Sequence, residues 1–256
     1  MQWFLNLGAV WQALIASLMM YLMTALGASF VFFSKKINKT VITALTGGAA
    51  GIMIAASFFS LLLPAIEYES SVPAYITAPV GFLLGGACVV LCDVLLSRKA
   101  FSPKGLGDKK NTLLFFSVTL HNIPEGMVVG VAFAAAGAEG AVLSAFFLAV
   151  GIAIQNFPEG MCVAFPLRAK GMSPLKSFLF SQGSGFIEIP SCIIGAVAAT
   201  FVSGLLPWAL TFSAGAMIAV VCSELVPECF SGNKTVATLG IVMGFCLMTV
   251  LDLALG

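Results

Sequence analysis

Two similar hexapeptides carry side chains of the kinds that bind metal ions in proteins. The first is His121-Asn-Ile-Pro-Glu-Gly126, and the second, which begins at position 155, is Gln155-Asn-Phe-Pro-Glu-Gly160. In both, a glutamate follows an asparagine by three residues and a histidine or glutamine by four. Side chains at these spacings project from one face of an α-helix. Each hexapeptide therefore predicts a glutamate that acts together with two neighbouring ligands.

The types of ligand indicate a divalent cation. The sequence offers one imidazole, two or three carboxylates and several amide oxygens, and the hexapeptides contain no basic residue that would bind an anion. This set suits Zn²⁺, Fe²⁺, Mn²⁺, Co²⁺ or Cd²⁺. A single imidazole among oxygen ligands predicts moderate affinity and ready release. Protons compete with the metal for such ligands, so binding should depend on pH.

The composition places these residues in a membrane. Hydrophobic residues make up 60% of the chain and charged residues 9%, which is outside the usual range for soluble domains. The apolar runs are long and continuous, without the alternation typical of barrel strands. We therefore predict an all-α integral membrane protein, a single transmembrane domain over residues 1–256 with eight transmembrane helices. These helices are expected at residues 7–33, 41–66, 74–97, 112–136, 140–166, 175–202, 206–230 and 235–255.

The basic residues predict the orientation of the chain. Lys and Arg near the ends of transmembrane helices stay on the cytoplasmic side. All 12 of them lie in or beside the connections that follow the first, third, fifth and seventh predicted helices. Both termini are therefore expected to face outward. The net charge of +1 reflects this bias, and nothing in the sequence indicates binding to nucleic acid.

A proline in each hexapeptide predicts a cavity. Pro124 and Pro158 each remove a hydrogen bond of the helix and free the carbonyls of Leu120 and Ile154. In a membrane, a freed carbonyl must line a cavity or find a partner. The fourth helix should run outward and the fifth inward, so the two hexapeptides should meet in antiparallel fashion near mid-depth. Transporters built from inverted repeats place their substrate in such an arrangement.

Charged side chains inside transmembrane helices are functional candidates, since each costs about 2.5–3.5 kcal/mol on insertion scales. Asp93 and Asp252 lie near the ends of their predicted helices, and for these two a structural hydrogen bond between helices is an equally open interpretation. The full set of ionisable candidates is Asp93, His121, Glu125, Glu159, Glu188, Glu224 and Asp252.

The two hexapeptides, within eight helices joined by short loops, resemble the ZIP (Zrt- and Irt-like) divalent metal transporters, and among these the bacterial GufA-like branch. The resemblance covers essentially the whole chain and is most specific in the fourth and fifth helices. It implies that these helices line the route of the metal around a binuclear centre. The first metal position would comprise His121, Glu125, Gln155 and Glu159. The second would comprise Asn122, Asn156 and Glu188, with Glu125 and Glu159 bridging.

One position departs from the family pattern. Asn156 stands where this branch often has aspartate, so three carboxylates remain to offset two divalent cations. Simultaneous filling of the second position is therefore not implied, and one transported ion can suffice. The resemblance also implies further residues along the pathway, which recur in steps of seven on the second and seventh helices: Met53, Ser60, Glu67, Met217 and Glu224.

The resemblance implies uptake of a divalent metal, Zn²⁺ first among the candidates, into the cytoplasm by alternating access. We expect the protein in a bacterial plasma membrane, surrounded by lipid, with a homodimer implied by the family alone. The metal is the substrate, and no cofactor acts as a catalyst. An intramembrane metalloprotease is excluded because the chain has one histidine and no HExxH pair. A metal-selective channel and a proton-coupled carrier of another solute remain open alternatives.

Overall fold

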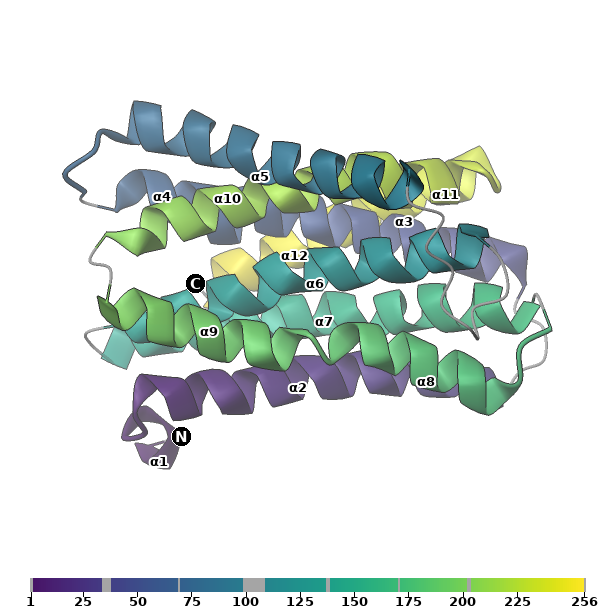
Figure 1. Cartoon of the computed structure of the whole chain (residues 1–256), viewed down its shortest axis with the longest axis horizontal. Helices are drawn as coiled ribbons and strands as arrows, with labels where there is room; N and C mark the ends of the chain where they lie inside the picture. Colours follow the sequence, from purple (N-terminus) through teal and green to yellow (C-terminus); the bar gives the residue numbers. More distant parts are fainter. Residues whose placement is uncertain are drawn as a thin grey trace.

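The computed structural model describes residues 2–33, 38–68, 70–98, 109–136, 139–169, 171–201 and 204–255. Within these ranges every regular element is helical, so the predicted all-α class is confirmed for the described chain. The helices run side by side as a bundle of long rods (Figure 1). Both termini lie toward the end of the bundle at which α4 and α9 also end (Figure 1).

The helices follow the predicted segments closely. In chain order the elements are α1 (Gln2–Leu5), α2 (Ala9–Ser29), η1 (Phe30–Phe32), α3 (Lys39–Ala56), η2 (Ser57–Leu62), α4 (Leu63–Glu67), α5 (Ala74–Arg98) and α6 (Lys109–Ala135). They continue with α7 (Glu139–Ala169), α8 (Pro174–Gly185), α9 (Glu188–Phe201), α10 (Leu205–Val220), η3 (Val221–Leu225), α11 (Val226–Phe230) and α12 (Lys234–Leu255).

Seven helical stretches in the described chain are long and apolar enough to cross a membrane. They are Ala9–Phe32, Lys39–Glu67, Ala74–Leu95, Gly140–Arg168, Pro174–Phe201, Leu206–Phe230 and Lys234–Leu253. In α6 the described apolar stretch is the shorter Asn122–Ala135. A multi-pass membrane protein is therefore supported, while the eighth crossing at 112–136 and the outward orientation of the termini stay predictions.

Two of the rods contain a π-helical segment just before a proline. In η2 the N–H of Leu63 donates to the carbonyl of Phe58, and in η3 the N–H of Val226 donates to the carbonyl of Val221. Each bond spans five residues instead of four. The next residue is Pro64 or Pro227, which has no N–H to continue an α-helical ladder. The widened turn absorbs that loss, and such π segments are frequent at functional sites.

The predicted sixth helix, residues 175–202, is not continuous. It is broken between α8 and α9 at Phe186 and Ile187. Pro190 lies in the first turn of α9, where backbone N–H groups make no bond within the helix, so its missing N–H costs nothing there. Inside a continuous helix its ring would clash with the carbonyl of Phe186. The break makes Glu188 the first residue of α9.

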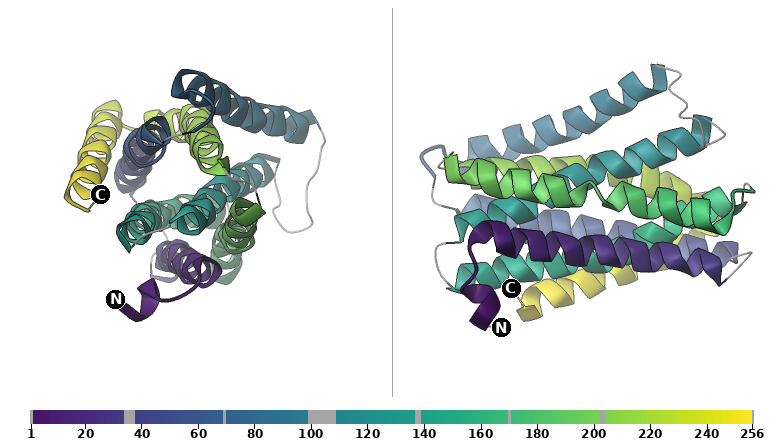
Figure 2. Two further views of the ribbon diagram at one scale, coloured as in Figure 1. Left: turned by 90° about the vertical axis from the view of Figure 1, so that its left-hand side faces the viewer. Right: turned by 60° about the horizontal axis from the view of Figure 1, so that its bottom comes forward.

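The rods form two groups, which the end-on view separates (Figure 2). In one group α2 packs on α7 and α9, and α6 packs on α9 and α7; α8 joins them. In the other, α3 packs on α12 and α5 packs on α10. The two groups meet mainly where α6 contacts α10 and where α7 contacts α3.

Glycines allow the backbones to approach closely within each group. A Cβ atom on Gly51 of α3 would lie 2.0 Å from the carbonyl oxygen of Ile241 in α12, and one on Gly130 of α6 would lie 1.9 Å from that of Cys192 in α9. Neither position can therefore accept a larger side chain without moving a helix. This fits the pattern of small residues at four-residue spacing that brings membrane helices together.

Candidate metal centre

The two hexapeptides lie inside α6 and α7, which pack against each other. The glycine that ends each one is a point of contact with another helix. A Cβ on Gly126 would lie 2.5 Å from the carbonyl oxygen of Glu188, and a Cβ on Gly160 would lie 2.1 Å from that of Thr24. The glycines thus let α9 and α2 come directly against the residues that could bind metal. Close approach explains why each glutamate is followed by glycine.

The polar side chains of the centre are buried. Their exposed fractions run from 0% for Asn122, Glu125, Asn156 and Glu188 through 1% for Gln155 to 6% for Glu159. Burial of this many polar groups in one place is costly unless each is paired or binds an ion.

Two hydrogen bonds join the elements of the centre. The Nε2 group of Gln155 on α7 donates to Oε1 of Glu125 on α6. The Nδ2 group of Asn156 on α7 donates to Oε1 of Glu188 on α9, at 2.7 Å. The two bonds join α6 to α7 and α7 to α9, so carboxylates and amides from three separate helices lie at one location.

Backbone carbonyls fix the orientation of the two asparagines. Nδ2 of Asn122 donates to the carbonyl oxygen of Ser184 at 3.0 Å, and Nδ2 of Asn156 also approaches the carbonyl oxygen of Met20 at 3.4 Å. Ser184 lies at the end of α8, directly before the helix break. Because the amide nitrogens are held by these acceptors, the amide oxygens are left to face other partners.

Several oxygens of the centre have no hydrogen-bond partner among the described residues. They are Oδ1 of Asn122, Oε1 of Gln155, Oδ1 of Asn156 and Oε2 of Glu188. A buried acceptor left without a partner costs about 1–3 kcal/mol. Four such acceptors together would be an unusual defect in a folded core. They are the atoms that a hard or borderline cation would use as ligands.

The charges of the centre have one sign. Among the described residues the charged side chains that are buried are Glu125, Glu159 and Glu188. The charges of Glu125 and Glu159 lie close enough to interact with Glu188. Carboxylates buried together are stabilised by a cation or by protons. The electrostatics therefore favour a cation, as the ligand types predicted.

The histidine is the one proposed ligand that cannot be placed by its side chain. His121 belongs to α6, one turn before Glu125, but its imidazole lies outside the described part of the structure. Among the described residues no three His, Cys, Asp or Glu side chains are grouped so as to hold a metal ion. A complete ligand set at this centre would therefore include the amide oxygens, and the role of His121 stays a prediction.

The residues predicted along the pathway separate into three places. Met53 and Met217 are buried in the main apolar cluster, with exposed fractions of 2% and 1%. Ser60 and Glu67 line a cavity at the end of the bundle where α4 ends. Glu224 is half-buried in η3. The predicted set is thus not gathered at one location.

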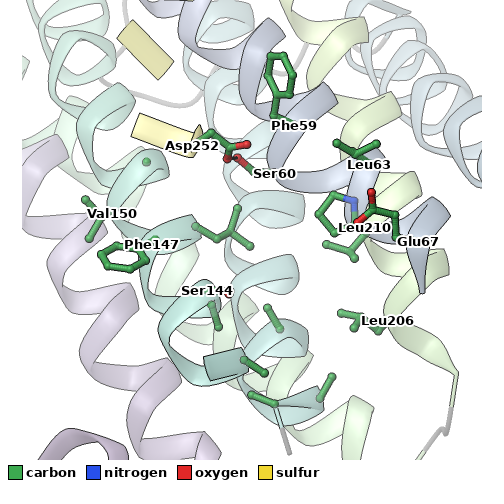
Figure 3. Close-up of a pocket in the computed structure, with 18 of the residues that line it drawn as sticks. Phe59, Ser60, Leu63, Glu67, Ser144, Phe147, Val150, Leu206, Leu210 and Asp252 are labelled. Carbon is green, nitrogen blue, oxygen red and sulfur yellow. Dashed lines mark hydrogen bonds between the residues drawn. The ribbon is translucent and has the colours of Figure 1, made fainter. Parts of the chain in front are cut away.

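The structure adds a partner that spacing alone did not reveal. Oγ of Ser60 in η2 donates to Oδ1 of Asp252 in α12 at 2.6 Å, and Figure 3 shows the two side chains together at the cavity wall. Two interpretations of Asp252 were open, a functional role and a structural hydrogen bond between helices. The structure shows the hydrogen bond between helices. No local sequence pattern links the two residues, which are 192 positions apart in the chain.

Comparison with known proteins identifies a family match and relatives that cover nearly the whole chain. The family model described as ZIP Zinc transporter matches residues 109–252. Human zinc transporter ZIP11 is 32% identical, over 97% of this chain and 98% of its own length. Zinc transporter GufA of Myxococcus xanthus is 35% identical, over 95% and 98%. Zinc transporter ZIPB of Bordetella bronchiseptica is 34% identical, over 91% and 78%. The family match and these relatives, together with the buried oxygen-rich centre, show that the chain belongs to the ZIP zinc transporter family.

Proposed function

We propose that this protein carries divalent metal ions, Zn²⁺ foremost, across the membrane into the cytoplasm. The observation that carries the proposal is the cluster of buried carboxylate and amide oxygens on α6, α7 and α9. Membership in a family of zinc transporters supports the same cargo. Cd²⁺, Fe²⁺, Mn²⁺ and Co²⁺ share the ligand preferences and are proposed as further cargo.

We propose two unequal metal positions in the centre. The first uses His121, Glu125, Gln155 and Glu159. The second uses Asn122, Asn156 and Glu188, with Glu125 and Glu159 bridging. The hydrogen bond from Gln155 to Glu125 supports the first grouping, and that from Asn156 to Glu188 supports the second. Each of these bonds must open, or its amide must turn its oxygen inward, for a cation to bind.

The proposed mechanism is alternating access by movement of one helix group against the other. The group that contains α6 and α7 carries the metal ligands, and the group built on α3, α5, α10 and α12 carries Ser60, Glu67 and Glu224. Contacts within each group are more extensive than those between them, which supports relative motion at the boundary. A binding site carried by one group then opens first to one side and then to the other.

The proposed orientation and setting are supported by charge and composition, and uptake is proposed from the family. The basic residues at alternate connections support a cytoplasmic location for those connections, so that both termini face outward in the plasma membrane. The sequence holds no Gly-rich nucleotide-binding loop, which supports transport without ATP. We also propose a homodimer, on family grounds alone.

The function is tested in proteoliposomes that contain a fluorescent metal indicator. We expect saturable Zn²⁺ influx in the wild type and at least a roughly tenfold slower rate in Glu125→Ala and His121→Ala, a loss of about 1.4 kcal/mol in transition-state stabilisation. Asp93→Asn is the matched control, since Asp93 is an exposed carboxylate on α5. Wild-type influx in both centre variants would refute the site assignment, and the absence of metal influx in the wild type would refute the function.

A further inference from the structure

A cysteine extends the line of ligands on α7 by one further turn. Gln155, Glu159 and Cys162 follow one another at steps of four and three residues, so their side chains project from one face of the helix. Past Glu159, α7 continues toward the connection that precedes α8. The proposed orientation makes this the cytoplasmic side of the metal centre. The thiol therefore lies where an ion that leaves the centre inward would pass.

Carboxylates of both helix groups act on this thiol. Glu159 of α7 and Glu228 of α11 are both close enough for their charges to interact with Cys162. Glu159 is buried in the metal centre, whereas Glu228 is exposed. The helix α11 packs on α3 of the other group and lies toward the end of the bundle at which α8 begins (Figure 1). Cys162 is thus within electrostatic reach of a carboxylate inside the centre and of one outside it.

The Cys162 side chain faces the boundary between the groups and is half-buried. Its Sγ lies 3.0 Å from Oγ1 of Thr46 on α3. When the thiol gives up its proton, the Thr46 hydroxyl can donate to the sulfur and stabilise the thiolate. The nearby Cys229 differs, because it is 1% exposed and its Sγ donates to the carbonyl of Val226 in its own helix at 3.3 Å. Cys162 is therefore oriented toward the other helix group, and Cys229 toward its own backbone.

A thiolate has a chemical preference that the oxygen ligands of the centre lack. Carboxylate and amide oxygens bind Mn²⁺ readily, whereas thiolate selects softer ions such as Zn²⁺ and Cd²⁺. Among the described residues no three His, Cys, Asp or Glu side chains are grouped so as to hold an ion. Cys162 and the two carboxylates would therefore meet an ion in succession. A single soft ligand on the route favours the passage of soft ions without trapping them.

We propose that Cys162 is a specificity-determining residue, whose thiolate binds a soft divalent ion briefly between the metal centre and the cytoplasm. This inference rests on the proposed function of metal transport. The thiol gives its proton to water as the metal–sulfur bond forms. It takes a proton back from water when that bond breaks and the ion moves on toward Glu228. Cd²⁺ and Zn²⁺ are favoured by this step, and Mn²⁺ is not.

Cys162→Ser tests the preference, because serine keeps a small side chain with a hydroxyl that can bond to Thr46 and replaces the sulfur by a hard oxygen. Influx of Cd²⁺, Zn²⁺ and Mn²⁺ is measured separately in proteoliposomes. We expect kcat/KM to fall at least about tenfold for Cd²⁺ and about threefold for Zn²⁺, and to stay within about twofold for Mn²⁺. Unchanged Mn²⁺ influx also shows that the variant is folded. No loss, or an equal loss for all three metals, would overturn the proposal.

Thr46→Val is the matched control at the same contact. It removes the hydroxyl beside the sulfur and leaves the thiol itself, so we expect kcat/KM for Cd²⁺ to change about threefold or less. If the contact had a structural role alone, Thr46→Val would lower the influx of every metal and Cys162→Ser would not alter the preference among them. Cys246→Ser changes an exposed thiol of α12 and should leave all three rates as they are.

Alkylation of the wild type gives a second measurement that needs no substitution. The protein in nanodiscs is treated with a maleimide, and mass spectrometry follows the peptide that contains Cys162. We expect saturating Cd²⁺ to slow its alkylation at least about tenfold, and Mn²⁺ at a concentration that saturates its own influx to leave it unchanged. Equal protection by both metals, or by neither, would overturn the proposal.

The two proposals fail separately. If the wild type shows no metal influx, the proposed function is wrong. If the wild type carries metal and Cys162→Ser keeps the same order of preference, the role of Cys162 is wrong and the proposed function stands.

Discussion

At the scale of single residues, Asn156 sets the charge of the centre. It is fully buried and donates to Glu188 at 2.7 Å. A donor at this position stabilises the carboxylate while the centre holds no metal. It adds no charge when the metal arrives. Three buried glutamates balance one divalent cation with charge to spare, but fall one charge short of two cations.

The substitution Asn156→Asp tests this charge balance. It supplies a fourth carboxylate, so four negative charges would face two divalent cations, and the loss of the donor to Glu188 would be compensated only with both ions bound. We expect the number of Zn²⁺ ions bound per chain to rise from about one to about two, as measured by calorimetry in nanodiscs, with lower thermal stability in the metal-free state. Asn156→Ser, which adds no charge, is the control. An unchanged stoichiometry in Asn156→Asp would contradict the account.

His121 should dominate the pH dependence of transport. Its ordinary pKa of about 6.5 is the one side-chain value among the proposed ligands that lies near neutral pH. Metal binds the neutral imidazole, so acid should weaken binding. We expect the KM for Zn²⁺ influx to rise by about tenfold between pH 7.5 and pH 5.5 in the wild type. In His121→Gln, which keeps an acceptor oxygen, the KM should be higher throughout and change less with pH. An equal slope in both proteins would show that the glutamates alone set the pH dependence.

At the scale of helices, close approach of α7 to α2 determines where the ligands lie. Gly160 follows Glu159 directly, and a Cβ there would lie 2.1 Å from the carbonyl oxygen of Thr24. A backbone atom cannot yield as a flexible side chain does. Any side chain at this position must therefore push the two helices apart, and Glu159 moves with α7.

The variant Gly160→Ala tests this contact. Overpacking of this kind costs about 1–3 kcal/mol, so we expect a lower midpoint of thermal unfolding and slower metal influx. Gly183→Ala on α8 is the matched control, because a Cβ there meets nothing within 4 Å. The midpoint can be followed by circular dichroism in detergent. Equal stability of the two variants would mean that α2 and α7 tolerate separation.

The helices themselves were largely predictable, because long apolar runs, basic residues and prolines are local signals. The predicted segments coincide with the rods of the bundle, and Glu125 of the first hexapeptide accepts a hydrogen bond from Gln155 of the second. The break before Glu188 was not predicted, although Pro190 signals it, because a proline can also sit in a kinked continuous helix. The bond from Ser60 to Asp252 joins residues 192 positions apart. Local pattern carries no information about such a pair.

At the scale of the whole molecule, the proposed mechanism makes the boundary between the two helix groups the surface along which the groups move. At one point on this boundary, a side chain of one group contacts a side chain of the other group. Oγ1 of Thr46 on α3 lies 3.0 Å from Sγ of Cys162 on α7, one turn beyond Glu159. A covalent bond here would join the group that carries the metal ligands to the group that does not.

Thr46→Cys would place a second thiol against the native Cys162, at a separation from which a disulfide can form with little movement. We expect oxidation of this variant to reduce Zn²⁺ influx at least about tenfold and reduction to restore it, because the groups can no longer move past each other. Formation of the bond is checked by mass spectrometry of the linked peptides. Wild type and Thr46→Cys/Cys162→Ala, which cannot form this bond, should respond to neither treatment. If the disulfide forms and Zn²⁺ influx continues at the rate measured in the reduced variant, α3 and α7 do not separate during transport. The metal would then move through a pore between fixed groups, as in the channel alternative, and flux that does not saturate would be its signature.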